Sequence, residues 1–264
     1  MIFETHAHYD DEAFDTDREE LLLSMQDGGV ETIVNIGADV ASSKQTLEFC
    51  DKYPFIYGAI GVHPSNTNAM TEEDFKWLEE TAKKYRMKAG GKVVAIGEIG
   101  LDYYWDKEDV TRANQRKWFE RQTVLAEEMG LPIVIHSRDA AKDTMDMMKA
   151  MNAGEIGGII HCYSYAKEQA REYLDMGFFF GIGGVLTFSN AKKLKEVVEY
   201  LPMDAIVLET DCPYLAPVPN RGKRNSSLNL IYVAEEIAKI KGKDVEKVIE
   251  QTKANARRVY RFDT

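Results

Sequence analysis

Eight short apolar segments alternate with segments of helical pattern along the whole chain, and this rhythm limits the folds open to it. The apolar segments are rich in isoleucine, valine and phenylalanine, as are strands buried on both faces of a parallel sheet. We expect strands at residues 2–5, 32–37, 55–62, 93–99, 132–136, 158–161, 178–182 and 205–209. We expect helices at residues 17–27, 39–53, 72–86, 112–129, 139–151, 167–176, 192–200, 230–241 and 245–260.

Eight strand–helix pairs with one further helix predict an α/β fold, namely a (βα)8 TIM-type barrel with an extra C-terminal helix. A length of 264 residues is ordinary for one such barrel, so we expect a single domain over residues 1–264. A doubly wound open sheet is the alternative.

Composition limits the cellular compartment and the binding partners that we expect for the chain. No apolar run approaches the roughly 18 residues that a membrane span needs, and the first residues lack the basic and apolar regions of a signal peptide. The three cysteines are widely spaced, which fits neither a disulfide framework nor a zinc ribbon. We therefore expect a cytoplasmic monomer without membrane association. The net charge of −11 disfavours general binding to nucleic acid, so any such contact must be local.

The five histidines of the chain all fall at or just after the C-terminal ends of expected strands, and none falls on an expected helix. They are His6, His8, His63, His136 and His161. Two carboxylates, Glu98 and Asp211, occupy the same kind of position on the fourth and eighth strands. In TIM barrels this end of the strands carries the active site, which makes these residues the candidates for chemistry.

His6 and His8 are two residues apart on the first strand, so their side chains point to the same face and can share one metal ion. The eighth strand adjoins the first in a barrel, so Asp211 can reach that metal. Asp211 could also take a proton from a metal-bound water. The alternative for His6 and His8 is a solvated pair at a strand end.

Glu98 lies inside an apolar strand, where a carboxylate is costly unless it is paired or bound to metal. Its two oxygens could bridge two cations. His136 and His161 end adjacent strands beside it and make a plausible shell for a second metal. The alternatives are a buried salt bridge for Glu98 and hydrogen-bonded core histidines for the other two.

Three further residues are candidates for binding substrate. His63 follows the third strand and could contact a phosphate oxygen, although capping of its loop is nearly as good an interpretation. Arg138 follows the fifth strand and could hold a phosphate. Arg224 could do the same from the basic cluster of Arg221, Lys223 and Arg224 after the eighth strand. The alternative for the basic cluster is a solvated surface.

Other side chains near the strand ends receive weaker interpretations. Tyr103, Tyr104 and Trp105 could stack on nucleic acid bases or could pack their loop. We expect Glu209 to support the metal ligands or to form an ion pair. We expect Cys162 and Cys212, after the sixth and eighth strands, to be small packed residues and not ligands. Neither a phosphate-binding GxxxxGK[ST] loop nor a GxSxG nucleophile elbow occurs in the sequence.

Taken in order, the strand-end segments resemble the successive motifs of TatD-type metal-dependent deoxyribonucleases. The segments are Thr5-His6-Ala7-His8, Gly61-Val62-His63-Pro64, Ile96-Gly97-Glu98-Ile99-Gly100-Leu101-Asp102-Tyr103-Tyr104, Ile135-His136-Ser137-Arg138-Asp139-Ala140, His161-Cys162-Tyr163-Ser164 and Leu208-Glu209-Thr210-Asp211-Cys212-Pro213-Tyr214-Leu215. The combination is specific although each motif alone is not. One departure is Arg224-Asn225-Ser226-Ser227, where the family usually shows Arg-Asn-Glu-Pro.

The resemblance implies a TIM-type barrel of the amidohydrolase-like superfamily and exonuclease activity on single-stranded DNA or 3′ ends. Residue by residue, His6, His8 and Asp211 match the ligands of one metal, and His136 and His161 match those of the other. Glu98 matches the bridging carboxylate.

The mechanism we expect uses two divalent ions, Zn²⁺, Mn²⁺ or Mg²⁺, to activate a water for phosphodiester hydrolysis, with Glu98 and Asp211 as catalytic carboxylates. The alternative enzyme is an amide, ester or lactone hydrolase acting on a small molecule with the same site, which the acidic charge favours. A binding module is the non-enzymatic alternative, and it gives no reason for so many convergent ligands.

Overall fold

The protein is described by a computed structural model that covers residues 1–87 and 90–262. Its strands are β1 (Ile2–Ala7), β2 (Val30–Ile36), β3 (Ile56–Ile60), β4 (Val93–Asp102), β5 (Ile133–Arg138), β6 (Gly158–Ile160), β7 (Phe179–Ile182) and β8 (Ile206–Leu208). Its α-helices are α1 (Arg18–Leu23), α2 (Val40–Lys52), α3 (Glu72–Tyr85), α4 (Asp109–Met129), α5 (Ala141–Ala150), α6 (Ala153–Ile156), α7 (Lys167–Asp175), α8 (Lys192–Tyr200), α9 (Leu230–Lys241) and α10 (Val245–Val259).

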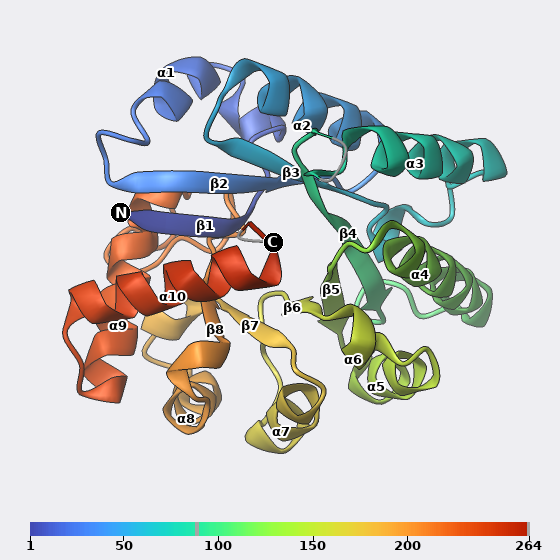
Figure 1. The fold of residues 1–264 in the computed structure, drawn as a ribbon. Helices are drawn as coiled ribbons and strands as arrows, with labels where there is room; N and C mark the ends of the chain where they lie inside the picture. The colour runs from blue at the N-terminus through green and yellow to red at the C-terminus, as the bar shows by residue number, and fades with distance from the viewer. Residues whose placement is uncertain (88–89, 263–264) are drawn as a thin grey trace. The chain divides into compact units, whose positions relative to one another are not determined.

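Neighbouring strands of the sheet follow one another in the chain, from β1 to β8, and helices alternate with the strands (Figure 1). This is the α/β TIM-type barrel with an extra C-terminal helix, α10, that the sequence predicts. The strand pairs β1–β2, β3–β4, β4–β5, β5–β6 and β7–β8 are all parallel. Within residues 1–87 and 90–262, no helix combines the length and apolarity needed to cross a bilayer.

The chain divides into two compact units. We call residues 1–35, 162–175 and 179–264 the terminal unit, and residues 36–161 and 176–178 the central unit. The single domain over residues 1–264 stays a prediction.

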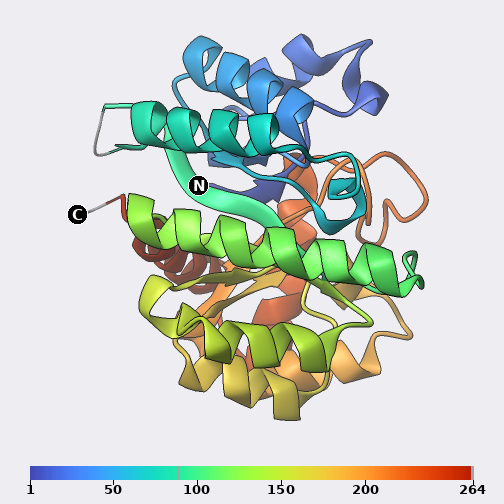
Figure 2. The ribbon, with the colours of Figure 1, turned by 90° about the vertical axis from the view of Figure 1, so that its right-hand side faces the viewer.

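In the central unit, β4 and β5 form the longest paired strands. Their register runs from Ile96 opposite Ile133 to Asp102 opposite Arg138. Helix α4 packs against β4 and buries Trp118 and Phe119, while α2 packs against β3. Figure 2 shows α3, α4 and α5 with nearly parallel axes.

Local sequence explains three of the helix ends in this unit. Helix α2 begins after Asp39, whose side chain accepts a hydrogen bond from the Ser42 amide in a reciprocal capping box. Thr71 caps α3 in the same way. Helix α4 ends at Met129, and Gly130 caps it with a φ of 64°, because glycine adopts the left-handed conformation without a Cβ clash.

In the terminal unit, α10 packs against β1 and β8. Residues near the two ends of the described chain meet in this unit, where the Phe3 and Phe262 rings pack edge to face at 5.4 Å. The Tyr260 hydroxyl donates a hydrogen bond to the Thr5 carbonyl at 2.8 Å, which fixes the end of α10 on β1. The last helix therefore supports the strand that carries His6.

The strands differ from expectation mainly at their C-terminal ends. Strand β1 continues to Ala7, β4 to Asp102 and β5 to Arg138, each past the predicted end. Most of these extra residues are polar or small, so their composition does not indicate a strand. Pairing between β4 and β5 holds the ends of those two strands extended. The sequence pattern does not indicate the short helix α6 either.

Candidate active site

The terminal unit brings His6, His8 and Asp211 together after the ends of β1 and β8. The Nε2 atoms of His6 and His8 are 3.1 Å apart. The Asp211 Oδ1 atom lies 3.4 Å from His8 Nε2 and 3.8 Å from His6 Nε2. Two imidazole nitrogens and a carboxylate oxygen facing one point are a donor set that suits a divalent cation.

Backbone bonds hold this group in place. The Asp211 amide donates to the His6 carbonyl at 3.0 Å, and the His8 amide donates to the Cys212 carbonyl at 2.9 Å. Asp211 has a φ of 56°, a left-handed backbone conformation that is uncommon for residues other than glycine. The N-terminal and C-terminal segments of the unit are thus joined at the site itself.

Glu4 supports this group from within β1, and the sequence reasoning missed it. Its carboxylate is fully buried and accepts hydrogen bonds from the amides of His6 and Thr210, both at 3.0 Å, and from the Thr210 hydroxyl at 2.7 Å. Burial raises the pKa of Glu4 to about 8 despite these bonds. Its position two residues before His6, on the same strand face, was the available signal.

The central unit gathers three imidazoles around one buried carboxylate. Glu98 Oε1 lies 2.7 Å from His136 Nδ1 and 3.8 Å from the Nε2 atoms of both His161 and His63. Glu98 and His161 are buried. A Cβ on Gly97 would come within 2.6 Å of the Val134 side chain, so glycine there permits the close approach of β4 to β5.

Asp102, at the end of β4, is a second buried carboxylate in this group, and the sequence reasoning did not select it. Its Oδ2 lies 3.1 Å from His136 Nε2, so both ring nitrogens of His136 face carboxylates. Burial disfavours the charged imidazole, but the bonds to Asp102 and Glu98 outweigh it and raise the pKa of His136 to about 9. His63, Asp102 and His136 offer ligand atoms within 4.8 Å of one another.

The three residues expected to contact substrate have different surroundings. His63 Nδ1 accepts a hydrogen bond from the Ser65 amide at 3.1 Å, which is the loop-capping contact, while its Nε2 faces Glu98. Arg138 lies with its guanidinium 4.1 Å from the centre of the Tyr104 ring.

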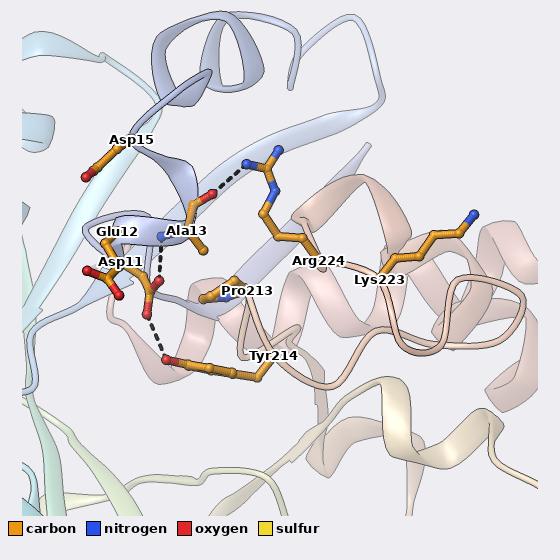
Figure 3. Close-up of a pocket in the computed structure, with 8 residues that line it drawn as sticks. All are labelled: Asp11, Glu12, Ala13, Asp15, Pro213, Tyr214, Lys223 and Arg224. Carbon is orange, nitrogen blue, oxygen red and sulfur yellow. Dashed lines mark hydrogen bonds between the residues drawn. The ribbon is translucent and has the colours of Figure 1, made fainter.

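Arg224 joins the segment after β8 to the segment after β1. Its guanidinium donates two hydrogen bonds to the Asp17 carboxylate, at 2.7 and 2.5 Å, and one to the Ala13 carbonyl at 2.7 Å. Figure 3 shows Arg224 directed at Ala13, and the Tyr214 hydroxyl directed at Asp11. The bond to Asp11 raises the pKa of Tyr214 to about 12. Phosphate binding by Arg224 stays a prediction, and it would have to compete with Asp17.

The departure from the family pattern falls on residues that organise the same loop. The Asn225 side chain donates to the carbonyls of Thr210 and Tyr214, at 3.2 and 2.8 Å. Ser227 is buried, and its hydroxyl lies 2.8 Å from the Tyr9 hydroxyl. In this chain the second serine of the motif therefore packs into the interior.

Glu209 is buried two residues before Asp211 and accepts a hydrogen bond from the Cys162 amide at 2.6 Å. A Cβ on Gly181 would come within 2.0 Å of Glu209 Oε2, so glycine leaves room for this carboxylate. A cavity of about 250 Å³ opens beside Glu209 and Asp211, with Val185, Leu194 and Leu215 among its lining residues.

Histidines and buried carboxylates at the strand ends of a TIM-type barrel define a class, the metal-dependent hydrolases. The model of one family, the TatD related DNases, matches residues 3–261. The chain belongs to this family, which confirms the resemblance seen in its motifs.

Individual relatives agree with this assignment. The chain is 45% identical over 263 residues to the uncharacterized metal-dependent hydrolase YabD of Bacillus subtilis (strain 168), covering 100% of both proteins. It is 30% identical over 266 residues to a protein of Cronobacter sakazakii named 3′-5′ ssDNA/RNA exonuclease TatD, covering 98% of this chain and 97% of that protein. The crystal structure of YJJV, a TatD homolog from Escherichia coli K12, superimposes with a TM-score of 0.90 at 25% identity, covering 98% of each chain.

Proposed function

We propose that the chain is an exonuclease-type deoxyribonuclease that hydrolyses phosphodiester bonds of single-stranded DNA or 3′ ends. The observation that carries the proposal is the presence of two ligand groups, His6, His8 and Asp211 in one unit and Glu98 with its imidazoles in the other. The name of the Cronobacter relative supports nucleic acid as the substrate class.

Two divalent ions are part of this proposal. His6, His8 and Asp211 would hold one ion, and His136 and His161 the other. Glu98 matches the bridging carboxylate of the family pattern and has two oxygens to offer, so it is the residue we assign to the bridging position. Imidazole and carboxylate donors suit Zn²⁺ or Mn²⁺ and tolerate Mg²⁺.

The bound ions would supply an activated water and offset charge on the phosphate oxygens. Asp211 would accept the proton of the attacking water, since its side chain is 21% exposed and next to both His6 and His8. The cavity beside Asp211 gives room for part of a substrate. Arg138 would contact a phosphate, which meets the need for local attraction on a chain of net charge −11.

The test compares substrates under metal control. We expect the purified protein, loaded with Mn²⁺ or Zn²⁺, to release mononucleotides from end-labelled single-stranded DNA, and dialysis against EDTA to abolish this release. A parallel series of amide, ester and lactone substrates is the control for the alternative enzyme. A higher kcat/KM for any of these than for DNA, or release that survives EDTA, would overturn the proposal.

The surroundings of His136 predict how metal binding depends on pH. Below its pKa of about 9 the imidazole of the metal-free protein carries a proton that competes with a cation. The apparent metal affinity should therefore rise with pH by up to about tenfold per unit and level off near pH 9. Asp102→Asn removes the strongest bond that favours the proton, so the rise should level off at a lower pH.

Calorimetric titration of the metal-free protein between about pH 6.5 and 8.5 measures this effect. Asp109→Asn, at the exposed start of α4, is the matched control and should follow the wild-type curve. An affinity that does not change with pH, or an Asp102→Asn curve equal to that of the wild type, would contradict the role given to Asp102.

A further inference from the structure

Two adjacent aromatic side chains face solvent in the loop after β4. Tyr104 is 44% exposed and Trp105 is 68% exposed, and their rings meet edge to face at 4.7 Å. Single exposed apolar residues are common, but a neighbouring pair of large aromatic rings is unusual and points to a binding role. The Arg138 guanidinium lies 4.1 Å from the centre of the Tyr104 ring and 5.7 Å from that of Trp105. We call Tyr104, Trp105 and Arg138 the aromatic platform.

The aromatic platform is joined to the candidate active site through one carboxylate. Asp102 Oδ1 accepts hydrogen bonds from the amides of Tyr104 and Trp105, at 3.0 and 3.3 Å. Asp102 Oδ2 lies 3.1 Å from His136 Nε2. Arg138 is opposite Asp102 in the β4–β5 register. A ligand on the platform would therefore lie at the end of the two strands that carry Glu98 and His136.

Side-chain hydrogen bonds to α4 and α5 hold the loop that carries the two rings. Tyr103 takes part in these bonds and so differs in role from Tyr104 and Trp105. The Tyr103 hydroxyl donates to Asp143 at 2.8 Å and accepts from Arg116 at 3.0 Å. Gln115 on α4 donates to the Asp106 carboxylate at 2.7 Å. Tyr103 thus packs the loop, whereas the Tyr104 and Trp105 side chains are exposed. Because hydrogen bonds hold the loop, binding a flat group to these rings costs less conformational entropy.

We propose that the aromatic platform stacks with the bases of a single-stranded nucleic acid, with Arg138 contacting its phosphate. The inference rests on the proposed nuclease function and adds the reason for a single-stranded substrate. A base can stack on a protein ring only when its face is free, so a paired duplex cannot use the platform. The guanidinium supplies a local positive charge on an acidic protein and suits a phosphate.

The test measures binding without hydrolysis. The 264-residue chain in EDTA is titrated with a dodecamer of thymidylate, and tryptophan fluorescence and anisotropy of a labelled oligomer are recorded. Trp118 is buried and Trp77 is half-buried, so quenching should come from Trp105. Trp105→Ala should weaken binding roughly fivefold to a hundredfold, the range for removing one base-stacking ring. Trp105→Phe keeps a ring and should bind within about threefold of the wild type.

Two further variants test the phosphate contact and serve as a control for the loss of an exposed ring. Arg138→Ala should reduce the slope of log Kd against log salt by about 0.7, the change expected when a single strand has one phosphate fewer neutralised by the protein. Tyr200→Ala removes a ring that is 45% exposed at the end of α8 and should leave binding unchanged. Equal affinity of Trp105→Ala and the wild type for the thymidylate dodecamer would overturn the proposal. A Trp105→Ala substitution that weakens binding to a duplex of the same length by the same factor would overturn it too. Failure of the nuclease proposal is distinguished because it would show as absent hydrolysis with metal while this binding persists.

Discussion

Replacing Glu98 with glutamine is expected to lower kcat/KM on single-stranded DNA on the order of a thousandfold or more, because a cation supplies several kcal/mol of charge stabilisation. The substitution keeps the shape of the side chain. It removes the negative charge that lies 2.7 Å from His136 Nδ1 and 3.8 Å from His161 Nε2. Metal content should fall together with turnover, and Glu98→Ala should abolish both.

Elemental analysis of the purified variants and a single-stranded DNA assay measure the two quantities. The control is Glu108→Gln, an exposed carboxylate before α4 that makes no capping bond. It should retain metal and activity. A Glu98→Gln protein with full metal occupancy and full turnover would exclude the bridging role. Thermal unfolding of each variant separates a damaged site from a damaged fold.

The barrel could be predicted from the sequence because its signals are local. Isoleucine and valine in β5 and β6 give short apolar runs, and Asp39 and Thr71 supply caps that mark the starts of α2 and α3. A central parallel strand is apolar on both faces, so a short isoleucine- and valine-rich run between helical patterns indicates it.

The ends of the strands could not be predicted in the same way. Leu101 and Asp102 continue β4 only because Ser137 and Arg138 pair with them. That pairing is a property of two distant segments, and no local preference of an aspartate reports it. Asp102 was therefore overlooked, although it follows Glu98 by four residues and so shares its strand face.

Residue type alone does not indicate which neighbours each charged side chain contacts. Arg224 has the chemistry of a phosphate ligand, but its donors are engaged by Asp17 and by the Ala13 carbonyl. Arg138 instead lies over the Tyr104 ring. A sequence shows that a guanidinium is available near a site, whereas its partner depends on how loops meet.

Replacing Asp211 with asparagine is expected to lower kcat by about a hundredfold to ten-thousandfold, the usual effect of removing a general base. The amide has nearly the same size and can still place an oxygen near His8 Nε2, which lies 3.4 Å from the present carboxylate. It cannot accept a proton from water at neutral pH. KM for single-stranded DNA should change little, because the aromatic platform and the phosphate contacts are untouched.

The Asp211→Asn and Glu98→Gln variants should differ in metal content. The Asp211→Asn protein should keep most of its metal, since His6 and His8 remain, and should lose the limb of the pH–rate profile that reports the base. Asp175→Asn, an exposed carboxylate at the end of α7, is the matched control and should leave kcat unchanged. If Asp211→Asn loses its metal in proportion to its activity, Asp211 acts as a ligand alone and the proton goes elsewhere. If kcat falls while metal content and KM stay unchanged, Asp211 accepts the proton, and the remaining ligands are sufficient to hold the ions.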